Sequence, residues 1–325
     1  MAGGNSGHFS DQERKNLLVD YGLLFIQTLN GVQLGLLLFL VASGLTLVFG
    51  ILDFVNLAHG SLYMLGAFIC ASLTFLVGNF LLAVLIALPL TGIIGFLVER
   101  TIARSLYARN HLDHVLGTFG LILVLDTLTH LFWGPEGIAI PLPDWLDGQI
   151  ALFGDVVIPT YRVLIIGVGL LTAAGLFWLV NYTRLGMLIR AGASNRTMVS
   201  ALGIDISTLF ALVFALGAML AGLAGMLVAP ITEASIGMGN SIIITAFVVI
   251  IVGGIGSMKG AFIGAILIGL IDTLGRSFID DAFKLVMEAE AAETAAPAVS
   301  AMLIYIIMAI VLALKPQGLF PPKVR

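Results

Sequence analysis

The stretch SIIITAFVVIIVGGIGSMKGAFIGAILIGLIDTLG occupies residues 241–275, and its only charged residues are Lys259 and Asp272. A helix needs about 20 mostly apolar residues to cross a bilayer, so this stretch is long enough for two crossings. Glycine, serine and lysine interrupt the apolar run at residues 253–260. Because glycine readily adopts turn conformations, we expect the chain to turn or hinge at three glycines in this segment: Gly253, Gly254 and Gly256.

The rest of the chain repeats this apolar pattern. Of the 325 residues, 59% are hydrophobic and only 10% are charged, whereas about a quarter of the residues of a soluble domain are charged. This composition excludes a soluble enzyme. Further apolar runs predict an all-α integral membrane protein with a single bundle of eight to nine transmembrane helices; these runs are 21–49, 54–77, 80–98, 114–133, 160–180, 209–232 and 300–314.

Several other classes of protein are also excluded by the residue content. The net charge of −4 provides no basic surface for nucleic acid. The single cysteine, Cys70, cannot form an intramolecular disulfide. The chain contains no Gly-Lys dipeptide, hence no Walker A phosphate loop, and its five histidines form no metal-binding motif. The sequence predicts no cofactor, no metal site and no catalytic activity.

The positions of Lys and Arg predict the orientation, because short basic loops stay in the cytoplasm. The loop after residue 98, the loop after residue 180 and the C-terminus are basic. The segments 134–158 and 276–299 are acidic and are predicted to lie outside. Residues 1–20 read as a polar N-terminal extension. Arg14 and Lys15 favour a cytoplasmic N-terminus, whereas two full crossings at 21–49 and 54–77 place it outside; either run could also be broken or re-entrant.

Polar residues interrupt two apolar runs near residues 53–64. Such groups are tolerated at membrane depth only where protein or a wet cavity surrounds them. Two interpretations are open: these residues line or gate a translocation path, or they form a turn between helices with Gly60 as the breaker. The candidate path residues are Asn56, His59, Gly60, Ser61 and Tyr63.

The basic segment 184–208 is too polar to span a membrane but carries apolar residues at helical spacing. A short amphipathic helix on the cytoplasmic side could serve as a docking surface for a partner protein. Alternatively, it could lie on lipid head groups, attracted by its arginines.

Two acidic residues in apolar runs, Asp126 and Asp272, suggest a second possible transport mechanism, in which solute movement is coupled to protons. Intramembrane acids relay protons in many secondary transporters. Each could equally be a structural group that pairs two helices.

Several segments, in order, resemble the branched-chain amino-acid ABC transporter permeases of the LivH type. The resemblance covers residues 21–322 and includes the basic segment, which resembles the family's cytoplasmic coupling segment. It is carried by the segments NGVQLG at 30–35, GLTLVFGI at 44–51, NLAHG at 56–60, ALGI at 201–204, VGGIGS at 252–257, GAFIG at 260–264 and KPQGLF at 315–320.

This resemblance implies the permease subunit of an ATP-driven importer in the bacterial inner membrane. The expected partners are a sister permease, giving a heterodimer, two cytoplasmic ATPase subunits and a periplasmic solute-binding protein, with membrane lipid around the bundle. The expected solutes are branched-chain or other hydrophobic amino acids. The residues expected to couple to the ATPase are Arg184, Arg190, Ala191, Gly192, Ala193, Ser194, Asn195, Ala201, Leu202 and Gly203.

Two departures from the family pattern leave the solute open. The N-terminal extension is one, and the acidic, alanine-rich stretch 288–300, which predicts a longer outer loop, is the other. The same family includes permeases for urea, short amides and other small solutes. A proton-coupled secondary transporter remains the alternative from a different class.

Overall fold

The computed structural model describes residues 11–153, 156–284 and 289–321. Some predicted features lie outside these ranges. They are residues 1–10 of the polar extension, Asp155 and Glu288 of the two acidic segments, and the basic C-terminal residues Lys323 and Arg325.

The described chain is almost entirely helical. Its long helices are α1 (Asp11–Leu52), α2 (His59–Val77), α3 (Phe80–Val98), α5 (His111–Trp133), α6 (Thr160–Tyr182), α9 (Ile206–Thr232), α10 (Met238–Gly253), α11 (Met258–Lys284) and α12 (Ala289–Leu314). Short elements connect them: the π-helical turn Glu99–Ala103, α4 (Arg104–Leu106), the strands β1 (Gln149–Phe153) and β2 (Val156–Pro159), and the helices α7 (Arg184–Ser194) and α8 (Arg196–Ala201).

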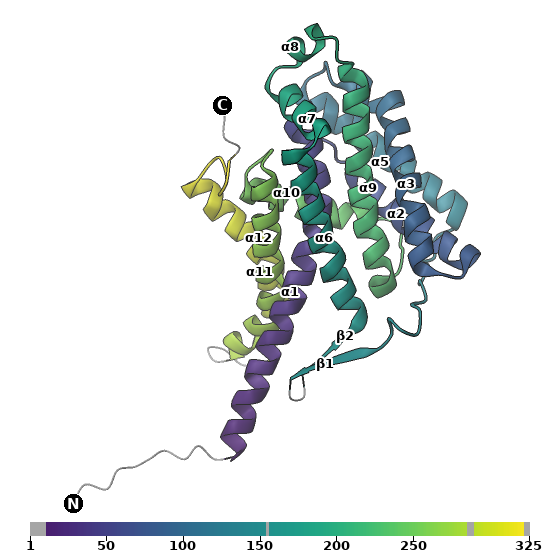
Figure 1. The fold of residues 1–325 in the computed structure, drawn as a ribbon. Coiled ribbons are helices and arrows are strands. Elements are labelled where there is room, and N and C mark those ends of the chain that lie inside the picture. The colour runs from purple at the N-terminus through teal and green to yellow at the C-terminus, as the bar shows by residue number, and fades with distance from the viewer. Residues whose placement is uncertain (1–10, 154–155, 285–288, 322–325) are drawn as a thin grey trace, which may run out of the picture.

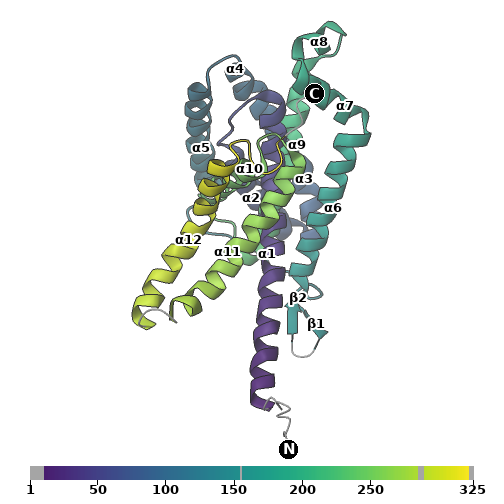
Figure 2. The same cartoon turned by 90° about the vertical axis from the view of Figure 1, so that its left-hand side faces the viewer.

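Eight helices of the described chain are long and apolar enough to span a bilayer, and the shorter apolar helix α10 accompanies them. The first apolar run, 21–49, is continuous helix, whereas the second, 54–77, is helical only from His59, because a turn follows Leu52. Figures 1 and 2 show the start of α1 at the end of the bundle opposite to the segment α7–α8.

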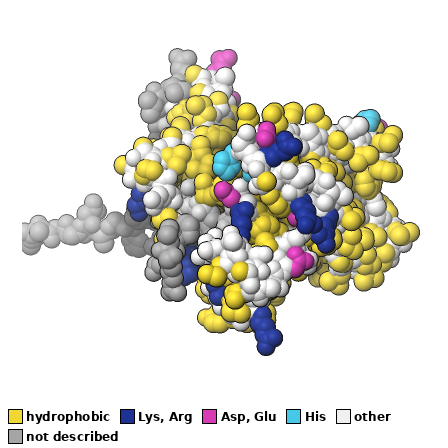
Figure 3. Space-filling model, turned by 90° about the horizontal axis from the view of Figure 1, so that it is seen from above, with side chains coloured by type: hydrophobic (Ala, Val, Ile, Leu, Met, Phe, Trp, Pro, Cys, Tyr) yellow, Lys and Arg dark blue, Asp and Glu magenta, His cyan; other side chains and the backbone are white. Residues whose placement is uncertain are grey.

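Charge assigns these ends to the two sides of the membrane. The loop that follows α3 and the segment α7–α8 lie at the same end of the bundle (Figure 2). Figure 3 views this end and shows Lys and Arg side chains on it, bordered by apolar side chains. Because basic loops stay in the cytoplasm, we expect this to be the cytoplasmic end, in which case helix α1 starts outside despite Arg14 and Lys15.

The bundle has a buried centre and a lipid-facing periphery. The spans of α1, α2 and α9 are mostly buried, whereas those of α3, α5, α6 and α12 are mostly exposed. Their exposed side chains include large apolar ones such as Leu85, Leu131 and Leu171. Exposed apolar side chains on long helices face lipid, so this distribution matches a membrane bundle in which α1, α2 and α9 are the core.

Helices of this bundle touch backbone to backbone at glycines. A Cβ atom built on Gly60 would lie 2.2 Å from the carbonyl oxygen of Gly239, which joins α2 to α10. A Cβ on Gly66 would lie 2.4 Å from Cα of Gly222, which joins α2 to α9. Since lipid is as apolar as the side chains, helices in membranes associate through such close packing.

The predicted pair of helices at 241–275 is present, with the turn at 254–257. Gly254 and Gly256 have φ angles of 110° and 79°, which side chains other than glycine rarely adopt. The C-terminal segment closes over this turn, because the backbone nitrogens of Leu319 and Phe320 donate to the carbonyl oxygens of Val252 and Gly253, each at 2.9 Å.

The acidic stretch near the C-terminus differs from the predicted long loop. Helix α11 runs to Lys284 and helix α12 begins at Ala289, so residues 289–299 are helical despite Pro297. Alanine and glutamate dominate this stretch, and both are strong helix formers. The other outer segment forms a hairpin of β1 and β2 and a bridge between Ile138 and Ala234.

The glycine contact between α10 and α11 predicts a large effect of one methyl group. A Cβ on Gly253 would lie 2.2 Å from the carbonyl oxygen of Gly260. We expect Gly253→Ala to destabilise the bundle by about 1–3 kcal/mol, as overpacking does. Thermal unfolding of the purified protein in detergent measures this loss. Gly167→Ala on α6 is the control, because nothing lies within 4 Å of its Cβ position; equal unfolding temperatures for the two variants would contradict the prediction.

Candidate functional site

The cytoplasmic segment after α6 forms two short helices rather than the single one predicted. Thr183 caps α7 by accepting a hydrogen bond from the Gly186 nitrogen at 3.1 Å. Asn195 has an extended backbone that ends α7, and its side chain accepts from the Met198 nitrogen at 2.9 Å to start α8. Two capping residues within one segment therefore produce a helix–break–helix unit.

One face of this unit packs on the bundle and the other is exposed. Ile189, Gly192 and Val199 are buried. The exposed side includes large apolar side chains, with Met198 60% exposed and Leu202 72% exposed. The predicted coupling residues divide accordingly: Gly192 is buried, Ala191 is half-buried, and the exposed ones are Arg184, Arg190, Ala193, Ser194, Asn195, Ala201, Leu202 and Gly203.

Arg196 fastens this unit to the membrane bundle. Its Nη2 donates to the carbonyl oxygen of Ile51 at the end of α1, at 3.0 Å. Its guanidinium carbon lies 5.3 Å from the ring centroid of Phe210 on α9, a cation–π contact. Arg190 makes a second attachment by donating to the carbonyl oxygen of Val180 on α6. A displacement of α8 must therefore act on α1 and α9.

Beneath Arg196 lies a cluster of aromatic side chains around the turn that joins α1 to α2. The ring of Tyr107 lies edge-on to those of Phe210 and Phe54, with centroids 5.8 Å and 5.3 Å away. Burial raises the pKa of Tyr107, and the neighbouring carboxyl group of Glu99 raises it further. The Glu99 side chain is fully buried. This enclosed carboxyl group at the cytoplasmic end was not among the residues predicted from the sequence.

The turn itself, residues 53–58, has unusual backbone geometry. Asp53 has a φ angle of 51°, in the left-handed region that few residues other than glycine adopt. The backbone nitrogen of Leu57 donates to Oγ1 of Thr118 on α5 at 3.3 Å. Asn56 is 1% exposed. The turn is therefore fixed to α5, and it directly follows the end of α1 that Arg196 contacts.

The predicted path residues at the start of α2 all lie in the closed interior of the bundle. Nε2 of His59 lies 3.2 Å from the carbonyl oxygen of Val41 on α1. Ser61 donates to Asp126 on α5 at 3.5 Å, and Asn240 on α10 donates to the same carboxyl group at 3.4 Å. Asp126 thus bridges α2, α5 and α10. Gly60 and Tyr63 are buried beside them.

Arg196 and Asp126 gain significance only from the structure. Both were visible in the sequence as a basic loop residue and an intramembrane acid. Neither their partner atoms nor the three-helix junction at Asp126 follows from spacing, because the partners are up to 145 residues away along the chain.

The comparisons with known proteins agree on one family. The family model described as the branched-chain amino acid transport system permease component matches residues 27–312. The permease protein BraD of Pseudomonas aeruginosa is 33% identical over 271 residues, which are 79% of this chain and 88% of that protein. The permease LivH of Escherichia coli K12 is 30% identical over 280 residues, 81% of this chain and 89% of that protein.

A sugar permease is also similar, at lower identity. The ribose import permease RbsC of Escherichia coli K12 is 26% identical over 242 residues, which are 72% of each protein. No solved structure matches the chain.

The attachment of α8 predicts a local change when Arg196 is removed. Arg196→Ala eliminates the hydrogen bond to Ile51 and the contact with Phe210, so we expect faster hydrogen exchange in residues 196–201 and in the turn 53–58. Hydrogen–deuterium exchange of the purified protein measures both. Arg184→Ala is the matched control, because this exposed arginine is the first residue of α7 in the same unit; equal exchange in the two variants would show that Arg196 does not anchor it.

Proposed function

Because the chain belongs to the family of branched-chain amino acid transport permease components, we propose that it moves branched-chain or other hydrophobic amino acids into the cell. The family is one of multi-pass inner-membrane permeases of ABC importers, non-catalytic subunits that carry solute. The observation that supports the assignment is the match over residues 27–312, nearly the whole length of the bundle.

The choice of solute rests on the comparison of relatives. BraD and LivH, named as branched-chain amino acid permeases, are 33% and 30% identical to the chain, and the ribose permease RbsC is 26% identical. Amino-acid permeases also align over more of the chain. These differences favour an amino acid over ribose. Because this family consists of ATP-driven importers, membership in it also argues against the hypothesis of a proton-coupled secondary transporter, which Asp126 and Asp272 had suggested.

Permeases of this family work with ATPase and binding-protein partners. For this chain we propose two ATPase subunits, a sister permease and a periplasmic binding protein. The exposed face of α7 and α8 is the proposed ATPase contact, with residues 190–194 at its centre, because Met198 and Leu202 expose apolar surface on a polar, cytoplasmic element. Residues 1–20 would be an extension outside the permease domain of residues 21–322.

The attachment of α8 provides a route for coupling. A ligand can shift an equilibrium between two states only if it binds them differently. ATPase closure would move α7 and α8, and the bond from Arg196 to Ile51 would pull on the turn between α1 and α2. That turn leads directly into Asn56, His59, Gly60, Ser61 and Tyr63. We propose that these residues form the gate of the path, closed in this structure.

The first experiment assembles the importer. The chain is co-expressed with ATPases, sister permease and binding protein from the same organism and reconstituted in lipid nanodiscs. We expect the ATPases to co-purify and ATP hydrolysis to rise when the binding protein is loaded with leucine, isoleucine or valine. Stimulation by ribose or urea instead would replace the proposed solute; failure of any ATPase to co-purify would overturn the importer.

A single substitution tests the contact surface. Ala193 is exposed on α7, so Ala193→Glu should leave the fold intact but place a bulky charge in the ATPase contact. We expect ATPase co-purification to be lost while the permease remains monodisperse in detergent. Ser105→Glu is the control, an exposed cytoplasmic position outside the coupling unit. If both variants retain the ATPases, the contact lies elsewhere.

A further inference from the structure

A cavity of about 330 Å³ lies between α1, α10, α11 and α12. This volume falls within the range of small-molecule sites. Its lining is mainly aliphatic, with three hydroxyl groups from Ser241, Thr245 and Tyr305 and two charges from Asp272 and Arg276. The aliphatic lining residues are Leu34, Leu38, Ile242, Ile244 and Ile304.

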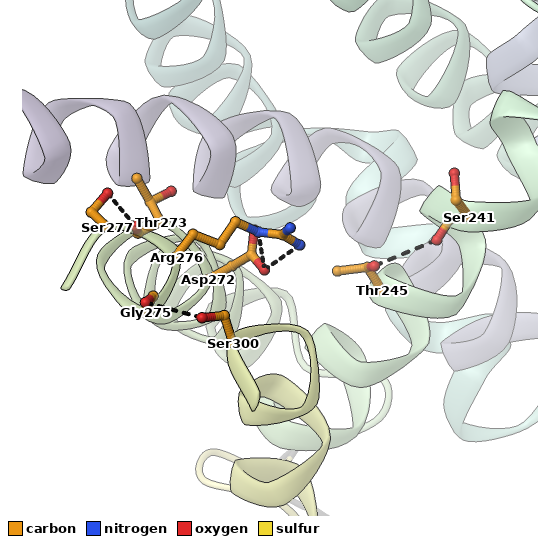
Figure 4. A network of polar contacts seen from close by, with 8 residues as sticks. All are labelled: Ser241, Thr245, Asp272, Thr273, Gly275, Arg276, Ser277 and Ser300. Carbon is orange, nitrogen blue, oxygen red and sulfur yellow. Dashed lines mark hydrogen bonds and ion pairs between the residues drawn. The ribbon is translucent and has the colours of Figure 1, made fainter. Parts of the chain in front are cut away.

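The two charged residues form an ion pair at the side of this cavity. Nε of Arg276 lies 3.0 Å from each Asp272 carboxylate oxygen, and Nη2 lies 2.9 Å from one of them. In Figure 4 the guanidinium group points across the gap toward Thr245 and Ser241 on α10. Charge and hydroxyl groups therefore face one another over an otherwise apolar space.

The depth of this pair makes contact with lipid implausible. Asp272 follows Met258, the first residue of α11, by 14 positions, which places it about 21 Å along a helix about 40 Å long. The pair thus lies near the middle of the membrane. Charged side chains at this depth are costly to bury and almost always face the protein interior or a water-filled cavity.

A purely structural role explains the pair poorly. Asp272 and Arg276 are four residues apart on the same helix, so their bond fastens no two helices together. Ion pairs of this spacing stabilise a helix by only about 0.2–0.5 kcal/mol. Helices α11 and α12 are instead joined by Ser300, whose Oγ donates to the carbonyl oxygen of Gly275 at 3.2 Å.

Arg276 also borders a second cavity, of about 360 Å³, closer to the outer ends of α11 and α12. Asp280, Glu293 and Ser300 line this outer cavity. The Arg276 side chain is 60% exposed, compared with 16% for Asp272. The guanidinium group therefore lies between the outer cavity and the deeper, mainly apolar cavity. A solute that enters from outside would contact this group before it reaches the deeper cavity.

From this arrangement, and on the basis of the proposed function, we infer that the deeper cavity binds a zwitterionic amino acid with an aliphatic side chain. The guanidinium of Arg276 would bind the α-carboxylate and the Asp272 carboxylate would bind the α-ammonium group. Charge-assisted bonds of this kind are roughly twice as strong as neutral ones. The aliphatic walls would take the side chain. The pair has no net charge, which suits a zwitterion, and the walls offer few partners for the hydroxyl groups of a sugar.

The site can be blocked without touching the charges. Ala301 lines the cavity and the adjacent Met302 does not. In liposomes containing the assembled importer and loaded binding protein, we expect Ala301→Trp to lower leucine uptake about tenfold or more, because the indole ring would fill the cavity and each tenfold loss corresponds to about 1.4 kcal/mol of solute binding, while the subunits still co-purify. Met302→Trp, at a position 56% exposed, is the matched control and should transport normally. Normal uptake by Ala301→Trp would overturn the inference.

Direct labelling separates a solute site from a structural role. Photo-leucine, a diazirine analogue of leucine, is delivered by the binding protein during ATP turnover, irradiated and located by mass spectrometry. We expect adducts on α10 and α12 peptides that contain Ile242 or Ile304, competed by leucine and lost in Arg276→Gln. Adducts found only around residues 56–63 would contradict the inference that the deeper cavity binds the solute, and would leave the proposed function intact. If wild-type complexes show no leucine-dependent uptake or ATP hydrolysis, the proposed function itself fails.

Discussion

Close backbone contact at paired glycines is the constraint on which this structure depends. In a membrane, lipid is as apolar as the surfaces of the helices, so the hydrophobic effect does not drive the helices to associate. Close van der Waals packing has to stabilise their contacts instead. Gly60 meets Gly239, Gly66 meets Gly222 and Gly253 meets Gly260 with no space for a methyl group. These contacts put α2 at the centre, against α9 and α10, and they leave the polar residues at its start enclosed rather than open to lipid.

The same constraint separates what the sequence predicts from what it does not. Apolar length and basic loops predict the helices, their turns and the cytoplasmic end, because each is a local property of 20 or so residues. Which helices touch depends on glycines far apart in the chain, and composition does not pair them. The acidic, alanine-rich stretch shows a different failure: its charge and its departure from the family pattern predicted a longer outer loop, but residues 289–299 are helical, as the helix propensity of alanine and glutamate favours.

The residues of the candidate site show a similar limit, because their sequence positions do not reveal which atoms they contact. Charge and apolar spacing predicted a short amphipathic helix within 184–208, and only the family resemblance implied a coupling role for it. In the structure Asn195 divides this segment in two, and the partner of Arg196, Ile51, is 145 residues away along the chain. Asp272 was identified as an intramembrane acid that either relays protons or pairs helices. In the structure Asp272 forms an ion pair with Arg276 on the same helix. We therefore relate this carboxylate to the binding of a charged solute rather than to proton transfer.

Helix α1 connects the two regions that matter for transport. Its cytoplasmic end accepts the hydrogen bond from Arg196 at Ile51, and farther along the same helix Leu34 and Leu38 form part of the cavity wall. Ile51 and Leu38 are separated by about 20 Å of continuous helix. A helix packed this tightly transmits displacement as a rigid body rather than bending locally, because packed interiors yield little. A pull on Ile51 would therefore reach the cavity as a shift of its wall against α10 and α11, so that a step at the cytoplasmic surface could change the shape of a solute site in the middle of the membrane.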